Sequence, residues 1–281
     1  MKKISLNCVI IISLLTGCAN LNKIKSETCK VTDQHGAIIE EWSNFYDKEG
    51  RTINNKRYRI KDNYYWNRST TFNADGTVKE IIDYQNNDKI DQTTKLEYDS
   101  GKCIKDSVYD DNNNLIHYTI IKYPSPFIEI CFNYNAKDEL RSKEKYVYDL
   151  EGRIIKILFY NLKGNLEGKE IISYNKDFLQ PIMTFHKLRQ NYTKSLYTLD
   201  NRGNIIKEIR YENGVYQEKT VYEYNSNYNL SSISGFKKRK FYGRKNFIYR
   251  DDNFKLLKSF VVYDSENKII ENGEFHYTFY Y

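Results

Sequence analysis

Proline is scarce in this chain of 281 residues, which holds 3 prolines and 13 glycines. Because proline cannot donate a hydrogen bond to a strand ladder, its scarcity favours long paired strands. Enzyme signatures are missing too: the chain has no Gly-x-Ser-x-Gly elbow, phosphate-binding loop or dinucleotide fingerprint. The four histidines, His35, His117, His186 and His276, lack partners at metal-ligand spacing. We therefore expect no enzymatic activity, no metal and no cofactor.

Long apolar runs are absent apart from one short stretch at the N-terminus. Residues 1–3 carry two lysines, residues 4–15 are mostly apolar, and Leu15, Thr16, Gly17 and Cys18 follow. The stretch is too short to span a bilayer and is typical of a secretory signal. Its ending resembles a bacterial lipoprotein signal. The resemblance implies that Cys18 receives a diacylglycerol on Sγ, that cleavage precedes it, and that its new amino group takes a fatty acid such as palmitate.

The lipoprotein signal divides the chain into three parts. We expect a signal peptide over residues 1–17, a lipidated tether over 18–34 and a β-repeat domain over 35–281. Ala19 replaces the Asp associated with inner-membrane retention, so a Gram-negative host would hold the protein in its outer membrane. Several acyl chains anchor a protein stably where one would not. An ordinary signal peptide with a coincidental cysteine is the alternative.

Cysteine is also rare, with Cys18, Cys29, Cys103 and Cys131 left after the signal. If Cys18 is lipidated, an odd number of thiols remains. Cys103 and Cys131 lie 28 residues apart, so we expect them on next-but-one strands about 9–10 Å apart. That separation exceeds the reach of a disulfide. The spacing therefore predicts isolated, half-buried thiols.

Acidic and amide side chains form two patterns that could carry chemistry. Asp110, Asn112 and Asn114 match the opening of a calcium loop, but Leu115 stands where such a loop needs glycine. Glu40-Glu41 would point to opposite faces of a strand, because strand side chains alternate. The first pattern therefore predicts a polar turn, and the second makes a poor catalytic pair.

Aromatic residues are what the chain has in excess. Its mean hydropathy of −0.75 is low, yet 27 tyrosines help to bring the aromatic content to 15%. A disordered chain would lack these aromatics, so we interpret the sequence as folded. The net charge of +7 becomes +5 once Lys2 and Lys3 leave with the signal. This basicity is weak support for an anionic ligand, and we expect no nucleic-acid partner.

One pattern recurs along the chain and is clearest at residues 148–160, Tyr-Asp-Leu-Glu-Gly-Arg followed by an apolar run that ends on Tyr160. Successive closing residues are 11 to 14 apart, short and long steps alternating, which indicates a hairpin repeat with a different turn at each end. Asp or Asn after the aromatic can bond the backbone ahead of it, and glycine supplies a positive φ. The closing residues, here called anchors, are Tyr46, Tyr58, Phe72, Tyr84, Tyr98, Tyr109, Tyr123, Tyr134, Tyr148, Tyr160, Tyr174, Leu199, Tyr211, Tyr224, Tyr249, Tyr263 and Tyr277, with degenerate units near Phe185 and Phe236.

The repeat predicts an all-β fold, a long antiparallel hairpin meander of about 18 strands. The residue two before each anchor is mostly apolar, which predicts one aromatic-aliphatic face and one polar face. So wide a sheet should curl on itself, with the tyrosine-rich face inward. A β-propeller is the alternative, although no fourfold period is visible. A lipid-facing barrel is disfavoured, because Lys95 and Glu97 share one predicted face and Lys207 interrupts the other.

Three units, at residues 46–51, 148–153 and 199–204, resemble the YD repeats of Rhs-type bacterial surface proteins. The resemblance extends over residues 46–281. It implies a curled β-meander in a cell-envelope setting, with no activity attached.

Basic residues form one strong run, made of Lys237, Lys238, Arg239, Lys240, Arg244 and Lys245. It falls where the repeat degenerates. A solvated loop, or an edge strand kept monomeric by charge, explains the run. A contact with anionic lipid or lipopolysaccharide is the other explanation.

These patterns lead to one principal hypothesis. The chain is predicted to be a lipid-anchored bacterial envelope protein, a non-catalytic binding or structural repeat module. Its partners would be the membrane, through Cys18, and an envelope protein or glycan. The Rhs resemblance supports an alternative, in which the chain is an immunity or partner protein of a secreted Rhs-type toxin system.

Overall fold

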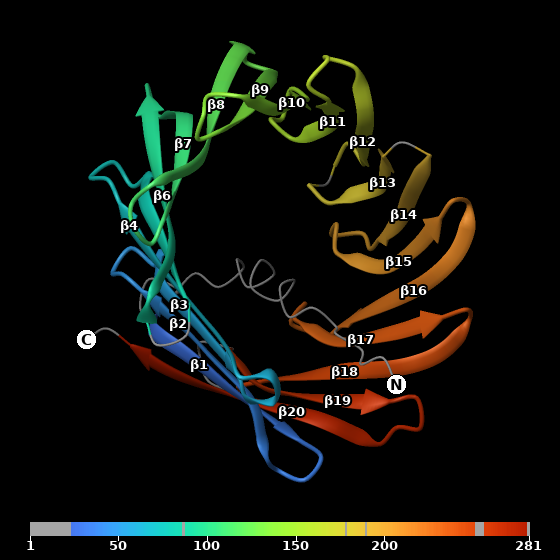
Figure 1. Cartoon of the computed structure of the whole chain (residues 1–281). Helices are drawn as coiled ribbons and strands as arrows, with labels where there is room; N and C mark the ends of the chain where they lie inside the picture. Colours follow the sequence, from blue (N-terminus) through green and yellow to red (C-terminus); the bar gives the residue numbers. More distant parts are fainter. Residues whose placement is uncertain (1–23, 86–87, 178, 189, 251–255, 280–281) are drawn as a thin grey trace.

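The computed structural model describes residues 24–85, 88–177, 179–188, 190–250 and 256–279. They form twenty strands and one short 3-10 helix, Ile60–Asp62, arranged as a single-layered ring (Figure 1). The strands are β1 (Ile24–Asp33), β2 (Ile38–Tyr46), β3 (Thr52–Arg59), β4 (Tyr64–Phe72), β5 (Val78–Tyr84), β6 (Ile90–Asp99), β7 (Lys102–Asp110), β8 (Leu115–Ser125), β9 (Ile128–Asn135), β10 (Leu140–Tyr148), β11 (Ile154–Tyr160), β12 (Leu166–Tyr174), β13 (Pro181–Leu188), β14 (Asn191–Leu199), β15 (Ile205–Glu212), β16 (Val215–Tyr224), β17 (Leu230–Lys237), β18 (Lys240–Tyr249), β19 (Leu257–Asp264) and β20 (Ile269–Phe279). Within these ranges, no helix is long and apolar enough to cross a membrane.

The sheet closes into a barrel, because each strand pairs antiparallel with the next and β20 pairs with β1. The all-β antiparallel prediction is confirmed. The curled meander is more completely closed than expected, and the propeller alternative is wrong, because the strands form one continuous sheet. The predicted tether is also wrong over residues 24–33, which form β1. This strand has no closing aromatic, which explains why the anchors predicted one strand fewer at this end.

The turns follow the predicted mechanism closely. In the turn after β10, the Asp149 carboxylate accepts hydrogen bonds from the backbone N–H groups of Glu151 and Arg153. Gly152 has φ 76°, which glycine adopts without steric cost. Asp110 does the same for Asn112 and Asn114, which confirms the predicted polar turn. The same pair of bonds occurs at Asp33, Asp47, Asn135, Asn161, Asp200, Asn225 and Asp264.

A tyrosine latch secures many of the strand starts. The Tyr174 hydroxyl, at the end of β12, donates to the carbonyl oxygen of Ile154 at the start of β11, at 3.0 Å. Ile154 lies at a β-bulge, where the ladder leaves backbone groups without strand partners. Four more tyrosines at or near the ends of even-numbered strands donate in the same way to a carbonyl oxygen at or near the start of the preceding strand. The pairs are Tyr123 with Cys103, Tyr224 with Ile205, Tyr249 with Leu230 and Tyr277 with Leu257.

The same bulges overturn the prediction of one aromatic face and one polar face. Tyr148 lies opposite Ile154, but Val147 lies opposite Lys156, so the bulge inserts one residue and reverses the alternation along β11. Such a shift carries every later side chain to the other face. Anchors of even-numbered strands therefore share one face, and anchors of odd-numbered strands share the other. For the same reason Lys207 lies on the face of Lys95, not on the opposite one.

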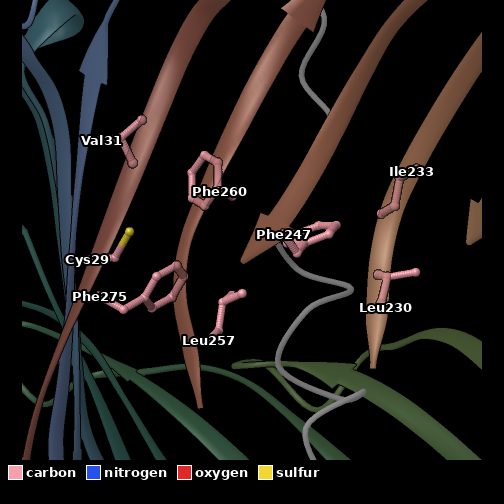
Figure 2. Packing of buried hydrophobic residues seen from close by; sticks show 8 residues of the cluster. All are labelled: Cys29, Val31, Leu230, Ile233, Phe247, Leu257, Phe260 and Phe275. Atoms are coloured by element: carbon pink, nitrogen blue, oxygen red, sulfur yellow. The ribbon is translucent and has the colours of Figure 1, made fainter. Parts of the chain in front are cut away.

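One face carries a buried apolar cluster over β17–β20 and β1, shown in Figure 2. No described segment is packed on the outside of the ring (Figure 1), so large apolar side chains this deeply buried point inward. Phe260 lies across Gly273 and is 2% exposed. We call β17–β20, β1 and β2 the apolar arc. The cluster consists of Cys29, Val31, Leu230, Ile233, Phe247, Leu257, Phe260 and Phe275.

The remaining strands, β3–β16, form what we call the open arc. Among its described inner residues at paired positions, Asp83, Val108 and Gly168 are buried, and the rest are at least partly exposed. A barrel filled by its own side chains would bury these positions. The inner wall of the open arc therefore faces water, as expected when a barrel has about 16 strands or more.

Cys103 and Cys131 match their prediction. They lie on β7 and β9, two strands apart, each is partly buried, and they form no disulfide. Cys29 lies elsewhere, in the apolar cluster on β1.

Candidate functional site

The inner wall over β2–β6 brings together both tryptophans of the chain. Trp42 on β2, Arg57 on β3 and Trp66 on β4 stand directly opposite one another across three neighbouring strands. Their strand positions put all three on the inner face, where Trp42 contacts the edge of Phe275 at a ring separation of 5.4 Å. The row therefore begins at the border of the apolar arc and runs into the open arc.

Two arginine–carboxylate pairs flank these rings. Arg57 donates from Nε and a terminal nitrogen to the two oxygens of Glu40, at 3.0 and 2.9 Å. Arg68 makes the same bidentate contact with Asp83, at 2.7 and 2.9 Å, and its guanidinium lies 5.3 Å from the Trp66 ring. Such forked contacts hold both partners in a fixed plane. The two pairs therefore present rigid, planar polar groups beside the indole rings.

Asp83 stays ionised although it is buried. Desolvation alone would raise the pKa of its carboxyl group, but hydrogen bonds from Arg68 and Gln92 outweigh that effect and hold the pKa below its ordinary value. The Asp83 side chain is 8% exposed, whereas that of Arg68 is 42% exposed. The wall thus offers a partly accessible guanidinium whose carboxylate partner lies underneath.

One hydrogen-bond donor in this wall has no acceptor among the described residues. The indole Nε1–H of Trp42 is buried and has no hydrogen-bond partner within the described chain. Leaving a buried donor unsatisfied costs roughly 1–3 kcal/mol. An acceptor that reached the wall beside Arg57 would remove that cost.

Tyrosine–carboxylate pairs recur on the inner wall, and two of them have the same spacing in the sequence. Tyr46 donates to Glu27 at 3.0 Å, and Tyr148 donates to Glu129 at 3.0 Å, each tyrosine 19 residues after its acid. Burial, together with the neighbouring carboxylate, raises the pKa of both tyrosines. Both phenols therefore remain protonated hydrogen-bond donors at physiological pH.

Glu27 closes the ring. On β1, it accepts hydrogen bonds from Tyr46 and Asn44 on β2 and from Tyr277 on β20, so it joins the first and last strands. The residue is 5% exposed. Burial raises the pKa of its carboxyl group, although the hydrogen bonds work in the opposite direction.

The Cys131 thiol lies on the inner face of β9 and is held in its protonated form. Burial and the nearby Glu129 raise the pKa of the Cys131 thiol to about 12, so the nucleophilic thiolate is rare at neutral pH. Within the described residues, no three His, Cys, Asp or Glu side chains gather as they would around a metal ion.

A smaller hollow of about 330 Å³ opens at the end of the apolar arc. The Asn225–Asn229 turn lines one side, and Phe247 and Tyr249 line the other. Asn225 already bonds the backbone of its own turn. The hollow therefore offers mainly amide groups above two rings, and Arg250 also lies on its lining.

The predicted basic run does not form one surface. Lys238 and Arg239 form the exposed tight turn between β17 and β18, which confirms a solvated loop. Lys245 is 4% exposed and lies inside the ring, with its ammonium 3.5 Å from the Phe260 ring centre, whereas Arg244 points outward. In a closed barrel none of these residues lies on an edge strand. Leu15, Thr16, Gly17 and Cys18 lie outside the described residues.

Sequence reasoning missed the wall of Trp42, Arg57, Trp66 and Arg68. Its members are far apart in the sequence, and only the strand register places them side by side. The one available signal was compositional: a chain with 27 tyrosines has only two tryptophans. Both occur within β2–β4, two strands apart.

Comparisons with known proteins give little beyond the architecture. No family model matches the chain, and no curated protein matches it. Among solved structures, a porin-like protein from Bacteroides uniformis is similar, with 12% identity and a TM-score of 0.39, over 92% of this chain and 98% of that one. A porin-like protein from Bacteroides vulgatus has 13% identity and a TM-score of 0.31, over 91% of this chain and 99% of that one. Likenesses this distant carry no argument about what the chain does.

Proposed function

We propose that this chain is a non-catalytic, lipid-anchored binding module of the bacterial cell envelope, and that its ligand is a neutral glycan bound on the inner wall over β2–β6. The anchor is the lipid expected on Cys18, which places the protein in the outer membrane of a Gram-negative host. The observation that carries the proposal is the row Trp42–Arg57–Trp66 with its two bidentate carboxylate pairs.

The chemistry of this wall suits sugars. The C–H faces of a pyranose pack on aromatic rings, and its hydroxyl groups both donate and accept hydrogen bonds. Arg57 and Arg68 are respectively 37% and 42% exposed, so both guanidinium groups can be approached from the interior of the ring by hydroxyl oxygens. A few fixed polar groups beside apolar rings are the usual composition of a binding site.

Because both tryptophans lie in the wall, tryptophan emission tests the proposal directly. The protein would be titrated with chito-oligosaccharides, dextran fragments and mannan fragments. We expect a saturable change in emission with at least one probe, and loss of that change in Trp66→Phe and Arg57→Gln. Lys56→Gln, on the outer face of the same strand as Arg57, is the matched control and should titrate like the wild type. Emission that no probe alters while the protein stays folded would contradict the proposal.

The anchor has its own test. Cells would be labelled with a palmitate analogue and their membranes fractionated, comparing the wild type with Cys18→Ala. We expect the label and the membrane association to depend on the Cys18 thiol. Label that persists in Cys18→Ala, or protein that is soluble in both forms, would reduce the proposal to a secreted binding protein.

A further inference from the structure

Lysines occupy the outer face of seven of the eight consecutive strands β8–β15, all but β9, and these strands lie side by side along the top and right of Figure 1. No acidic side chain occupies a paired outer position in this part of the described chain. We call this surface the lysine wall. It consists of Lys122, Lys143, Lys145, Lys156, Lys169, Lys187, Lys194 and Lys207.

Elsewhere on the outer face, some lysines have carboxylate partners. Lys30 lies 3.4 Å from Glu41, and Lys105 lies 3.1 Å from Glu97. In the lysine wall, by contrast, no ammonium group lies within 4 Å of a carboxylate of the described residues. Lys122 and Lys143 instead lie over the Phe132 ring. The described residues therefore do not neutralise the charge of the lysine wall.

At one position in the lysine wall, charge repulsion destabilises the folded state. Lys169 on β12 stands directly opposite Lys187 on β13. Like charges that face each other across two strands are destabilising. A surface that keeps such a pair, with no carboxylate of the described residues within 4 Å of either ammonium group, has the charge pattern of a site for a polyanion.

The row that contains this pair has a regular composition. Across β8 to β14 it reads Lys122, Ile130, Lys145, Leu158, Lys169, Lys187 and Tyr192. The first three lysines stand two strands apart, about 9–10 Å, with an aliphatic side chain between them. The row therefore alternates cations with apolar contact area, which suits a chain of charged sugar rings.

The curvature of the lysine wall favours a flexible polymer over a membrane as its partner. Eight of the twenty strands span roughly two-fifths of the circumference, so a flat bilayer could touch only a few of these lysines at once. Burying them in lipid would cost about 2–4 kcal/mol for each lysine at the bilayer midplane. A linear polymer can follow the curve and reach the whole row.

We propose that the lysine wall binds a linear acidic polysaccharide through its carboxylate or phosphate groups. This proposal is independent of the glycan site on the inner wall, because the lysines point away from Trp42 and Trp66. Binding here should be salt-sensitive, since it releases the counterions of the polymer, as in other polyanion complexes. It should leave tryptophan emission unchanged.

Fluorescently labelled alginate, a polyuronate, is the probe, and anisotropy measures its binding. The test variant is Lys169→Gln with Lys187→Gln, and the matched control is Lys56→Gln with Lys95→Gln, which removes two outer lysines beyond the wall. We expect alginate affinity to fall roughly tenfold or more in the test variant, because each lysine near an anionic surface contributes appreciably. The control should change little.

Stability provides the second readout. Since the test variant removes the Lys169–Lys187 repulsion, it should melt at the wild-type temperature or above it, so that lost binding cannot be ascribed to unfolding. Equal loss of alginate affinity in both variants would overturn the proposal, as would absence of alginate binding. Tighter binding to phosphatidylglycerol vesicles or to duplex DNA than to alginate would also overturn it.

Discussion

The apolar arc and the open arc are built from the same repeat, yet they bury their inner faces to very different degrees. In the apolar arc Cys29, Leu257 and Phe260 are 0%, 1% and 2% exposed. In the open arc inner positions such as Trp66, Glu129 and Phe159 remain partly exposed. The turns, bulges and latches are alike in both arcs, so they maintain the strand framework but do not determine where the core lies. We infer that the apolar arc contributes most of the packing energy and leaves the open arc available for ligands.

Two phenylalanines make this comparison sharp, because each lies opposite a glycine on the next strand: Phe260 opposite Gly273, and Phe159 opposite Gly168. Phe260→Ala should lower the free energy of unfolding by about 3–5 kcal/mol, since it empties a buried site. Phe159→Ala should cost clearly less, because its ring is already partly in water. Urea denaturation measures both values, and equal costs would contradict the distinction between the arcs.

A smaller effect is expected from the opposite change, overpacking of the apolar arc. A Cβ added at Gly273 would lie 2.2 Å from the Phe260 ring. Gly273→Ala should therefore cost about 1–3 kcal/mol in the free energy of unfolding. In the background of Phe260→Ala the added methyl group meets no ring, so the glycine change should be nearly neutral there. If a double-mutant cycle found no coupling between Phe260 and Gly273, the contact between the Phe260 ring and Gly273 would not be what buries Phe260.

The tyrosine latches should contribute about equally in both arcs, and each by less. Tyr174→Phe removes the hydrogen bond to the Ile154 carbonyl and should cost about 0.5–1.5 kcal/mol. Tyr160→Phe is the matched control, because Tyr160 ends the neighbouring strand, faces outward and lies against Lys143. Thermal denaturation of the two variants compares them. A control as destabilised as Tyr174→Phe would show that the latch hydroxyl contributes nothing specific.

The smallest expected effect at neutral pH concerns Glu27, where the apolar arc closes. Burial raises the pKa of its carboxyl group in the folded state, so the folded protein holds this proton to a higher pH than the unfolded chain does. Its contribution to stability is thus fully present below the ordinary carboxyl pKa and is lost as the pH rises through the raised pKa. Glu27→Gln should remove that loss.

Denaturation of wild type and Glu27→Gln at a series of pH values isolates this group from the other carboxylates. The difference in the free energy of unfolding should grow in favour of the variant as the pH rises above the ordinary range for glutamate. A constant difference across the series would mean that Glu27 titrates alike in the folded and unfolded states.

Local chemistry made the strands and turns predictable from the sequence. An aromatic residue followed by Asp149 and Gly152 specifies a turn through its own hydrogen bonds, and such signals located most strands from β2 to β20. β13 and β17 were predicted only as degenerate units of the repeat. What could not be predicted was the assignment of faces. One extra residue at each bulge, such as the one after Ile154, reverses the alternation, and nothing in the local sequence marks it.

The missed strand and the missed wall have related causes. β1 has no closing aromatic, and its pairing with β20 joins segments about 250 residues apart, so Glu27 and Tyr277 could not be connected from sequence. The row Trp42–Arg57–Trp66 likewise exists only once the register of β2, β3 and β4 is known. The lysine wall also depends on the strand register, because its lysines are evenly scattered along the sequence.

Acrylamide quenching of the two tryptophans tests the difference between the arcs most directly. Trp42 packs against Phe275 of the apolar arc, whereas Trp66 lies two strands away in the open arc, on the same inner face. Trp66→Phe reports Trp42 alone, and Trp42→Phe reports Trp66 alone. We predict that Trp66 is quenched strongly and emits at longer wavelength, and that Trp42 is quenched weakly. Equal quenching of the two, in folded protein, would contradict the division of the barrel into a packed arc and an open one.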